Sequence, residues 1–433
     1  MTSDWNETRA VAALRALFDA GVRAADPLSV LAAHLPEPPR SGRVVVVGAG
    51  KAAAKMALAV ERAWPEVPLT GVVIAPHGAD LPEPPAHRRI ALRFGAHPRP
   101  DASGAAAAAE ILEAVRGLTA DDLVLALISG GGSSLSTLPA EGLTLEELIA
   151  VNQALLDSGA PIHEMNCIRK HLSAFSGGRL ALAAAPARVL TLAISDVPGD
   201  DPEVIASGPT VADPSTYAEA RALVAHYRMG LPEAAMRHLA EGRDETPKPG
   251  DPRLAGNELR MIATPMMALE AMAEAARGMD LLPLILGDAL EGEARHVGQA
   301  LAGIARSAAT HGLPLGAPCV LLSGGETTVT MAPGTPGAGG RGTECLLGMA
   351  LALNGAPGTW ALCADTDGID GKSDAAGAIA GPDTLAMARR AGLDPRTALA
   401  EHRSYDVFEK AGSLIKTGPT LTNVNDVRIL LVT

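Results

Sequence analysis

The sequence predicts an α/β fold in two domains, built on parallel sheets with helices on both faces. Short apolar runs end in glycine-rich or aspartate-rich turns all along the 433 residues, and helical stretches follow them. This alternation of strand, turn and helix is typical of parallel sheets. At about 150 residues per domain, the length corresponds to two or three domains. Ligands bind such sheets beyond the carboxyl ends of the strands, where these turns fall.

The composition narrows the class of protein. Hydrophobic residues make up 47% and charged residues 20%, which is typical of a globular chain and excludes a disordered tail protein. There are 49 acidic and 36 basic residues, a net charge of −13, so non-specific binding to nucleic acid or to an anionic membrane is not expected. An anionic substrate must therefore be captured by local cations and helix N-termini.

The cysteines and the N-terminus indicate the compartment. The four cysteines lie far apart and form no C-x-x-C pair, so we expect buried, reduced thiols rather than a zinc site or disulfides. No apolar run reaches the roughly 18 residues of a membrane span. The first 25 residues are amphipathic and acidic near their start, unlike a signal peptide. We expect a cytoplasmic protein, and a homodimer is left open.

The first strand, Arg43 to Val47, ends in a glycine turn that leads into an alanine-rich helix. This turn places Lys51 at the positive end of the helix, which favours an anion site. A tight turn with a solvated lysine is the alternative. The candidate nucleotide-binding residues of this turn are Gly48 and Gly50.

The spacing of this turn also fits a loose dinucleotide fingerprint, which by itself is a weak signal. The fingerprint needs an acid at the end of the next strand to hold a ribose. That strand, Gly71 to Ala75, ends instead in Pro76-His77, which argues against NAD. The G-x-x-x-x-G-K-[ST] pattern of a P-loop is absent from the chain.

Two further strands end in glycine turns rich in hydroxyl groups. Consecutive backbone N–H groups without bulky side chains can form a nest for phosphate, whereas a flexible loop is the alternative. The first turn follows the strand from 122 to 128 and comprises Ser129, Gly130, Gly131, Gly132, Ser133 and Ser134. The second follows the strand from 320 to 322, adds a carboxylate, and comprises Ser323, Gly324, Gly325 and Glu326.

A cluster of cations stands out in so acidic a chain. Arg169, Lys170 and Arg179 lie within residues 166 to 179. Arginine suits bidentate binding of carboxylate or phosphate, so these side chains are candidates for clamping an anionic substrate. A solvated basic face paired with surface acids is the alternative.

Two aspartate-rich turns are candidates for a divalent cation. The strand from 189 to 194 leads to Asp196, Asp200 and Asp201, and the strand from 360 to 364 leads to Asp365, Asp367 and Asp370. Magnesium shared with substrate phosphates fits best, because it needs only one or two carboxylates. The alternative is that aspartates cap turns and helices. No Ser/His/acid triad or nucleophile elbow stands out.

A stretch rich in charge, proline and glycine at residues 241 to 256 predicts a domain linker. The predicted domains are 1–245 and 250–433. A second glycine-rich stretch, 332 to 342, is interpreted as a mobile loop that leads into Arg341.

Anion nests, isolated cations and aspartate turns together suggest phosphoryl transfer between small anions, which needs positioning and charge neutralisation. Taken in order from about residue 44 to 431, the motifs resemble the glycerate 2-kinase family, also called the MOFRL family, whose members have long carried the label hydroxypyruvate reductase. The matching blocks are GAGKAAAKMA, LISGGGSSL, IRKHLSAFSGGRLA, ISDVPGDDPEVIASGPTV, LLSGGETTVT, GGRGTE, DTDGIDG and TGPTLTNVNDVRIL.

The resemblance implies ATP-dependent phosphorylation of D-glycerate to 2-phosphoglycerate with Mg²⁺. It implies a Rossmann-like N-terminal domain, a smaller α/β C-terminal domain, and an active site in the cleft between them. Lys51 and Arg341 correspond to the family's proposed catalytic cations. The block around Arg341 departs from a GRNQE-like motif, because Gly342-Thr343 replace an Asn-Gln pair. Glu344 is retained and is a candidate substrate-binding residue.

The expected mechanism assigns charge neutralisation to Lys51 and Arg341, and the nucleotide phosphates to the Ser129–Ser134 turn. Asp196, together with Asp365 or Asp367, is expected to hold Mg²⁺ or to take the proton of the attacking hydroxyl. Two other functions remain open. One is an NAD(P)H-dependent hydroxypyruvate reductase, and the other is a non-catalytic regulator that binds a sugar acid or a nucleotide.

Overall fold

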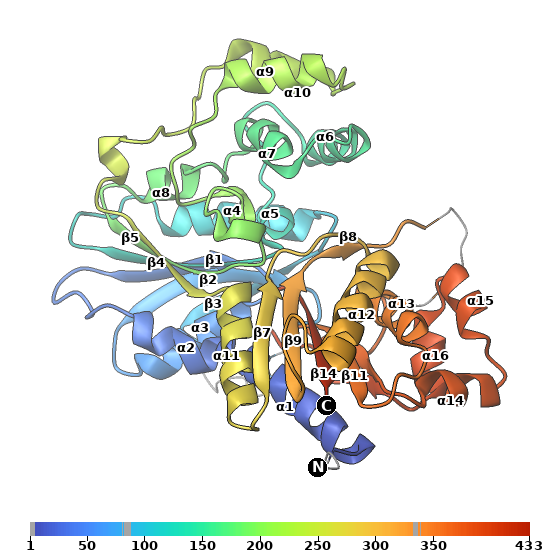
Figure 1. Cartoon of the computed structure of the whole chain (residues 1–433). Coiled ribbons are helices and arrows are strands. Elements are labelled where there is room, and N and C mark those ends of the chain that lie inside the picture. The colour runs from blue at the N-terminus through green and yellow to red at the C-terminus, as the bar shows by residue number, and fades with distance from the viewer. Residues whose placement is uncertain (1–4, 80, 82–87, 332–336, 338) are drawn as a thin grey trace. The chain divides into compact units, whose positions relative to one another are not determined.

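The structure, a computed structural model, describes residues 5–79, 81, 88–331, 337 and 339–433 (Figure 1). It contains two compact units. We call Pro27–Ile262 the Rossmann-like unit, and Met1–Asp26 together with Ala263–Thr433 the mixed-sheet unit. This division differs from the predicted domains, because the chain's first segment belongs with its last and the boundary lies at 262/263 rather than near 245. Most of the predicted loop at 332–342 lies outside the described residues.

The Rossmann-like unit is built on a six-stranded sheet in the order β3-β2-β1-β4-β5-β6. This is the strand order of a dinucleotide-binding sheet. The β1–β2, β1–β4, β2–β3 and β4–β5 pairs are parallel, as predicted. The strands are β1 (Val44–Ala49), β2 (Leu69–Pro76), β3 (Ile90–Gly95), β4 (Leu123–Ser129), β5 (Arg188–Ile194) and β6 (Glu258–Ala263).

Helices cover both faces of this sheet (Figure 1). Every residue of β1 and of β4 is buried, as expected of central parallel strands, whose valines and leucines face helices on each side. One face forms a core with α4 and α8. The helices next to the sheet are α2 (Pro27–Val30), α3 (Ala53–Ala63), α4 (Ala102–Ala114), α5 (Gly132–Leu135) and α8 (Arg179–Ala184).

Four further helices of this unit form a separate bundle with its own apolar core, around Leu148, Ile168 and Tyr217. Figure 1 shows them beyond the helices that cover the sheet. We call them the helical bundle: α6 (Leu145–Asp157), α7 (Ile162–His171), α9 (Tyr217–His226) and α10 (Glu233–Glu241). Side chains of α6 and α7 line a pocket together with the turn that follows β4, at the carboxyl edge of the sheet.

The predicted linker at 241–256 is wrong, because this segment packs within the Rossmann-like unit. Glu245 bonds the buried His171, with 2.8 Å between Oε1 and Nε2. Thr246 donates its hydroxyl proton to Oδ2 of Asp213 at 3.0 Å. Charged and proline-rich composition is typical of linkers, but here the charges are partners of buried groups.

The mixed-sheet unit has the strand order β13-β12-β11-β14-β9-β7. Here β7 and β9 are parallel, whereas β14 runs antiparallel to both β9 and β11. The general expectation of parallel sheets is therefore wrong for this half, since the last strand inserts in the middle of the sheet. The strands are β7 (Leu282–Gly287), β9 (Cys319–Gly325), β11 (Thr359–Asp365), β12 (Gly377–Ala380), β13 (Leu414–Ile415) and β14 (Asp426–Val432), with β8 (Gly292–Glu293) and β10 (Thr327–Thr328) as a separate parallel pair.

The predicted N-terminal amphipathic helix is α1 (Glu7–Ala24), and its apolar face packs on α11 (Pro265–Arg277) and on the mixed sheet. A second core lies among the remaining helices: α12 (Ala294–His311), α13 (Arg341–Leu353), α14 (Thr384–Arg390), α15 (Pro395–Ala400) and α16 (Ser404–Lys410). All four cysteines are buried and free, as predicted. None of the helices in the described part of the chain is long and apolar enough to cross a membrane.

Candidate active site

The glycine turns after β1 and β4 are bonded to each other at the carboxyl edge of the Rossmann-like sheet. The backbone N–H of Lys51 donates to the carbonyl of Gly130 at 2.9 Å. The N–H of Ala52 donates to Oγ of Ser129 at 3.1 Å. A parallel sheet aligns the ends of neighbouring strands, so two turns that are 78 positions apart in sequence lie side by side.

Two positions in these turns require glycine, because a neighbouring side chain lies where a Cβ atom would be. A Cβ at Gly130 would lie 1.7 Å from Oδ2 of Asp196, which places that carboxylate directly against the turn. Gly50 has a φ of +142°, and a Cβ there would lie 2.1 Å from Oγ of Ser129. The structure thus brings together Lys51, the Ser129–Ser134 turn and Asp196, which belong to three separate sequence motifs.

The helix that follows Lys51 offers a favourable end for an anion. Helix α3 begins at Ala53, and its N-cap residue Ala52 makes no side-chain capping bond. The first amide groups of a helix have no intrahelical acceptor, and the helix dipole adds positive potential there. The side chain of Lys51 is half-buried, and its Cγ would lie 3.5 Å from a Cβ built at Gly131.

Ser133 and Ser134, in the turn after β4, contact two residues that the sequence analysis did not identify. Ser133 shares a hydrogen bond with Ser207 at 2.9 Å between the hydroxyl oxygens. Ser134 bonds Nδ1 of His97 at 2.7 Å. His97 follows β3, a strand that the sequence analysis did not identify. Ser207 has a positive φ of 59°, a conformation that is uncommon for a serine and that no sequence motif indicated.

A pocket of about 690 Å³ lies beside this turn, wholly within the Rossmann-like unit. Its polar lining includes His97, Ser133, Ser134, Ser173, Ser176, Ser207 and Arg169. Helix α6 of the helical bundle supplies an apolar wall that includes Ile149 and Leu156. Its volume and mixed lining are typical of small-molecule sites.

The three predicted clamp cations have different surroundings. Lys170 is buried and paired with Asp213 at 3.3 Å between Nζ and Oδ1. Arg179 is buried and bonded to Asp244 through both the carboxylate and the carbonyl. Of the three, Arg169 alone lines the pocket. The ion pairs favour a structural role for Lys170 and Arg179.

In the mixed-sheet unit, Arg341 is the first residue of α13 and is enclosed by carboxylates. Its Nη2 lies 3.0 Å from Oδ2 of Asp365, and its Nε lies 2.9 Å from Oδ2 of Asp426. Its Nη1 bonds Glu326. Arg341 therefore joins the turn after β9, the end of β11 and the start of β14.

Burial and neighbouring charges shift the pKa values of Arg341 and Asp426 in opposite directions. Burial lowers the pKa of Arg341, but the carboxylates of Asp426, Asp365 and Glu326 outweigh it, and the pKa is raised. Burial raises the pKa of Asp426 to about 6, although Arg341 and Arg428 act in the opposite direction. Arg341 therefore stays charged, and the Asp426 carboxyl titrates near neutrality.

Arg428 holds the glycine turn at the end of β9 in place. Its guanidinium is fully buried and donates to the carbonyls of Gly324 and Gly325 at 3.0 and 3.1 Å. The predicted nucleotide-binding residues Ser323, Gly324 and Gly325 form the end of β9, and Glu326 bonds Arg341. In the structure this turn thus orients Arg341.

The departure from the family motif lies at the start of α13. The backbone N–H groups of Gly342 and Thr343 donate to the two carboxylate oxygens of Asp370 at 2.9 and 2.8 Å. Thr343 is buried, and its Oγ1 accepts a hydrogen bond from Ser404. Asp370 is thus a helix cap, which was the alternative to a metal ligand.

Glu344 is also buried, and its Oε1 bonds Arg295 at 2.6 Å and His402 at 3.1 Å. Burial raises the pKa of Glu344, while Arg295 and His402 lower it. Its predicted role in substrate binding remains a prediction, and these contacts favour a structural role.

The predicted metal ligands belong to different units, Asp196 to the Rossmann-like unit and Asp365 and Asp367 to the mixed-sheet unit. Among the described residues, no group of three or more acidic, histidine or cysteine side chains is placed to hold a metal ion. Asp365 bonds Arg341, and Asp367 accepts the N–H of Ile369 at 2.9 Å in a turn. Asp201 likewise accepts the N–H of Glu203. Asp196 lies with its carboxylate against Gly130 in the Ser129–Ser134 turn, and its role as a metal ligand remains a prediction.

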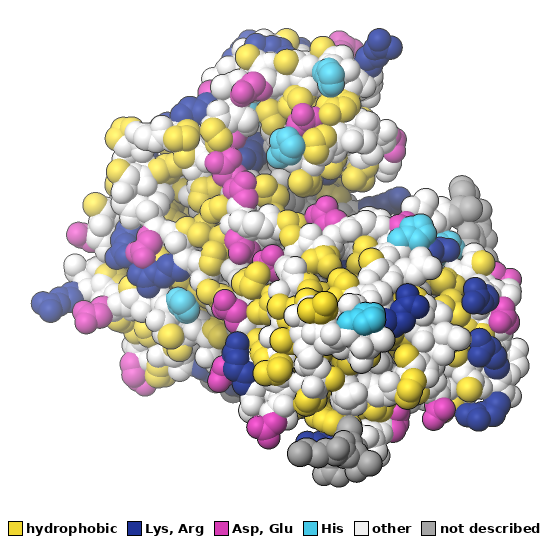
Figure 2. All heavy atoms as spheres, viewed as in Figure 1, with side chains coloured by type: hydrophobic (Ala, Val, Ile, Leu, Met, Phe, Trp, Pro, Cys, Tyr) yellow, Lys and Arg dark blue, Asp and Glu magenta, His cyan; other side chains and the backbone are white. Residues whose placement is uncertain are grey.

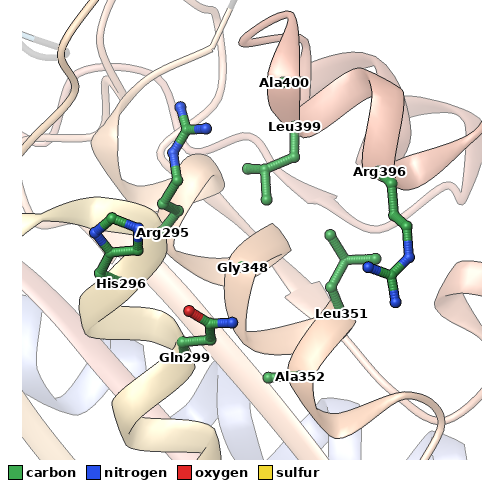
Figure 3. Close-up of a pocket in the computed structure, with 9 residues that line it drawn as sticks. All are labelled: Arg295, His296, Gln299, Gly348, Leu351, Ala352, Arg396, Leu399 and Ala400. Carbon is green, nitrogen blue, oxygen red and sulfur yellow. The ribbon is translucent and has the colours of Figure 1, made fainter.

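Another pocket, of about 350 Å³, lies in the mixed-sheet unit between α12, α13 and α15 (Figure 3). Arg295 and Arg396 line it, but their guanidinium groups point in different directions. Arg295 is already paired with Glu344. On the face that Figure 2 shows, Lys and Arg side chains lie in small groups among acidic and apolar ones.

Comparisons with known proteins agree with the motifs. Residues 13–240 match a family described as "Domain of unknown function (DUF4147)", and residues 319–426 match the MOFRL family. A glycerate 2-kinase from Pyrococcus horikoshii is 38% identical over 90% of this chain and 88% of its own length. The chain belongs to the glycerate kinase family. As a member of that family, it is a kinase.

Structural similarity extends over the whole chain. A crystal structure of glycerate kinase from Thermotoga maritima matches with a TM-score of 0.88 at 36% identity, covering 98% of this chain and 99% of that one. A relative from Agrobacterium vitis, 56% identical over 99% of this chain and 96% of its own length, carries the provisional name hydroxypyruvate reductase. The two-domain α/β fold and the resemblance to glycerate kinases are thus confirmed.

Proposed function

We propose that this kinase transfers the terminal phosphoryl group of ATP to the 2-hydroxyl of D-glycerate, giving 2-phosphoglycerate and ADP. The observation that carries the proposal is the convergence of Lys51, the Ser129–Ser134 turn and Asp196 at one edge of the Rossmann-like sheet. Phosphoryl transfer needs positioned cations and backbone donors more than a covalent nucleophile. These residues supply both.

The nucleotide phosphates are proposed to lie at the paired glycine turns. Gly48 allows β1 to lie close to Leu127 of β4, and Gly50 allows its turn to approach Ser129. The backbone N–H groups of the Ser129–Ser134 turn are proposed to bind the phosphates. Lys51 neutralises the charge of the phosphoryl group during transfer. The Ser323–Glu326 turn is proposed to act through Arg341 instead of holding the nucleotide directly.

Mg²⁺ fits the Rossmann-like unit through Asp196. When bound, it would neutralise phosphate charge as a Lewis acid. The carboxylate of Asp196 against Gly130 lies beside the proposed phosphate position, and magnesium commonly uses one or two carboxylates together with substrate phosphates. Asp196 is alternatively the acceptor of the proton from the attacking hydroxyl. Asp365 and Asp367 remain the other predicted candidates, and in the structure they bond Arg341 and a turn N–H.

Arg341 is proposed as the second catalytic cation, as the family resemblance implies. Its raised pKa keeps it charged, so it can stabilise negative charge at any physiological pH. Asp365 and Asp426 hold its guanidinium in place. The protein is further proposed to act in the cytoplasm, where its four free thiols remain reduced. A homodimer remains a prediction.

The reductase function is the second candidate, since relatives carry that provisional name. The strand order of the Rossmann-like sheet would suit a dinucleotide. However, β2 ends at Pro76, and the following His77 bonds Asp101. The acid that would hold a ribose at this strand end is thus replaced by proline and histidine, which favours the kinase.

The deciding experiment supplies the purified protein with ATP, Mg²⁺ and D-glycerate, and detects the product with enolase alone. Enolase consumes 2-phosphoglycerate but not the 3-isomer, so a direct signal establishes both the reaction and the position. ADP without an enolase signal would show a different acceptor or position. Oxidation of NADH by hydroxypyruvate, without formation of ADP, would establish the reductase instead.

A further inference from the structure

Arg169 is a partly buried cation that has no counter-charge among the residues that the structure describes. Lys170, Arg179, Arg295, Arg341 and Arg428 are each paired with a carboxylate. Within the described part of the chain, no carboxylate lies at ion-pair distance from Arg169, and burial lowers its pKa. A charge removed from water without a partner is costly, so its presence in a pocket indicates an anionic ligand.

Two asparagines hold this guanidinium in place. Oδ1 of Asn152 accepts from Nε at 2.9 Å, and Oδ1 of Asn166 accepts from Nη1 at 3.3 Å. Amide oxygens orient the guanidinium but leave its charge intact, whereas aspartates would neutralise it. Only two of its five N–H groups are used in this way, and the guanidinium lines the 690 Å³ pocket.

The hydroxyl groups in this pocket suit a hydroxy acid. Ser207 lies 2.9 Å from Ser133, at the edge of the proposed phosphate turn, and 3.5 Å from Oδ1 of Asn166. Ser173 also lines the pocket, and its oxygen already accepts two backbone N–H groups, so its own proton is free to be donated. Hydroxyl groups of Ser133, Ser173 and Ser207 thus lie in the same pocket as the Arg169 guanidinium, beside the Ser129–Ser134 turn.

We propose that Arg169 anchors the carboxylate of the acceptor, a small 2-hydroxy acid, and that Asn152 and Asn166 are positioning residues that make the site select anionic acceptors. The single positive charge of Arg169 matches the single negative charge of a carboxylate, and a guanidinium can donate two parallel hydrogen bonds to it. A triphosphate carries several charges and has Lys51 and the glycine turns for partners. This inference rests on the proposed kinase function.

The sharpest test replaces Asn152 with aspartate, which has nearly the same shape but places a carboxylate beside Nε of Arg169. The Asn152→Asp variant should bind D-glycerate about 10- to 100-fold more weakly, since a charge-assisted interaction is lost to an internal ion pair. The KM for D-glycerate should rise by that factor, while the KM for ATP stays within about twofold. Arg169→Gln, which removes the charge, should have the same effect.

A specificity readout separates anchoring from general damage. The wild type should prefer D-glycerate to its neutral methyl ester by at least about tenfold in kcat/KM, and Asn152→Asp should abolish most of this preference. A merely structural defect would lower both values equally. Gln299→Glu is the matched control, because it adds the same charge by replacing an amide on α12, outside the pocket of Arg169.

The outcomes are distinct. If the wild type produces 2-phosphoglycerate but Asn152→Asp leaves its KM for D-glycerate unchanged, the anchor is wrong and the kinase function stands. A rise confined to the KM for ATP would assign Arg169 to the nucleotide and overturn the carboxylate assignment. If the wild type shows no turnover, calorimetry with D-glycerate decides. Binding that Asn152→Asp abolishes supports the anchor without the kinase, and absence of binding overturns both.

Discussion

At the scale of single residues, the positive charges of Lys51, Arg169 and Arg341 lie in three different surroundings. Lys51 lies in a glycine turn at a helix N-terminus, and Arg169 is held by the side-chain amides of Asn152 and Asn166. Arg341 is enclosed by three carboxylates. Among the described residues Arg169 has no carboxylate partner, which favours an incoming anion, whereas the enclosed Arg341 is held rigidly. We therefore expect substitutions of the three to alter different kinetic constants.

Lys51→Ala should lower kcat/KM by about 100- to 1,000-fold while the protein stays folded, because one positive charge at the transferring phosphoryl group is lost. The measurement is steady-state kinetics with the enolase-coupled assay, alongside circular dichroism. Lys55→Ala, one turn along α3, is the matched control and should stay within about twofold. Near wild-type kinetics for Lys51→Ala would remove this lysine from the mechanism.

Asp426 should make activity dependent on pH. Its pKa of about 6 means that the carboxylate that holds Arg341 is charged above that pH and protonated below it. kcat/KM should therefore rise with pH through about 6, and Asp426→Asn should lack this inflection. An unchanged pH profile in the variant would assign the inflection to another group.

The free energy of unfolding should depend on the Asp426 carboxyl in the opposite direction, falling as the pH rises. The folded-state pKa of Asp426 lies above that of a free aspartate, about 3.9. The folded state thus binds the extra proton, so this group's contribution to stability is present below about pH 4 and is lost as pH rises through about 6. The free energy of unfolding of the wild type should fall relative to Asp426→Asn over that range, as urea titrations can measure.

At the scale of elements, parallel strands are tied together at the end away from the site as well. Asp122, just before β4, accepts the backbone N–H of Arg43 at 2.6 Å and that of Thr119 at 2.7 Å. It also pairs with the guanidinium of Arg43 at 2.9 Å. The Arg43 side chain, the Thr119 amide and the Arg43 amide hold the pKa of Asp122 well below its usual range. This contact sets the start of β1 against β4.

Asp122→Ala should lower the free energy of unfolding by about 2–4 kcal/mol at pH 7, because two backbone donors lose their acceptor. Since the folded-state pKa is depressed, the stabilisation is present above about pH 4 and is lost as pH falls below it. Urea unfolding at pH 7 and at pH 3.5 measures both effects. Asp121→Ala, an exposed neighbour, should change stability by less than about 0.5 kcal/mol. Equal effects of the two variants would contradict the interpretation.

At the scale of the whole molecule, the two ends of the chain build one unit. Helix α1 packs with Leu14, Leu17 and Phe18 against α11 and the mixed sheet, although more than 200 residues separate these segments. The Rossmann-like unit is thus inserted in the sequence of the other unit.

Phe18→Ala should destabilise the mixed-sheet unit by about 3–5 kcal/mol, because Phe18 is 2% exposed and its removal leaves a cavity. Thermal unfolding followed by hydrogen exchange can assign the loss to α1, α11 and the mixed sheet. Arg15→Ala, on the exposed side of the same helix, should have little effect. Loss of protection confined to residues 27–262 would contradict this division of the chain.

Much of the local structure followed from the sequence. The strands now seen as β1, β2, β4, β5, β9 and β11 were predicted from apolar runs, and their turns from glycine and aspartate. The strand β3 was missed, and with it His97, because Arg93 interrupts its apolar pattern. Antiparallel β14 was missed as a central strand, since an apolar run does not reveal its direction.

The sequence by itself determined the fold class, the family and the turns that carry the candidate site, because apolar periodicity and glycine spacing are local properties. Only the tertiary structure decided which cations have partners. Arg169, Lys170 and Arg179 look alike in sequence, yet Asp213 and Asp244 neutralise the last two from distant segments. Whether a charge is compensated depends on contacts across the fold, and therefore no spacing along the chain could reveal it.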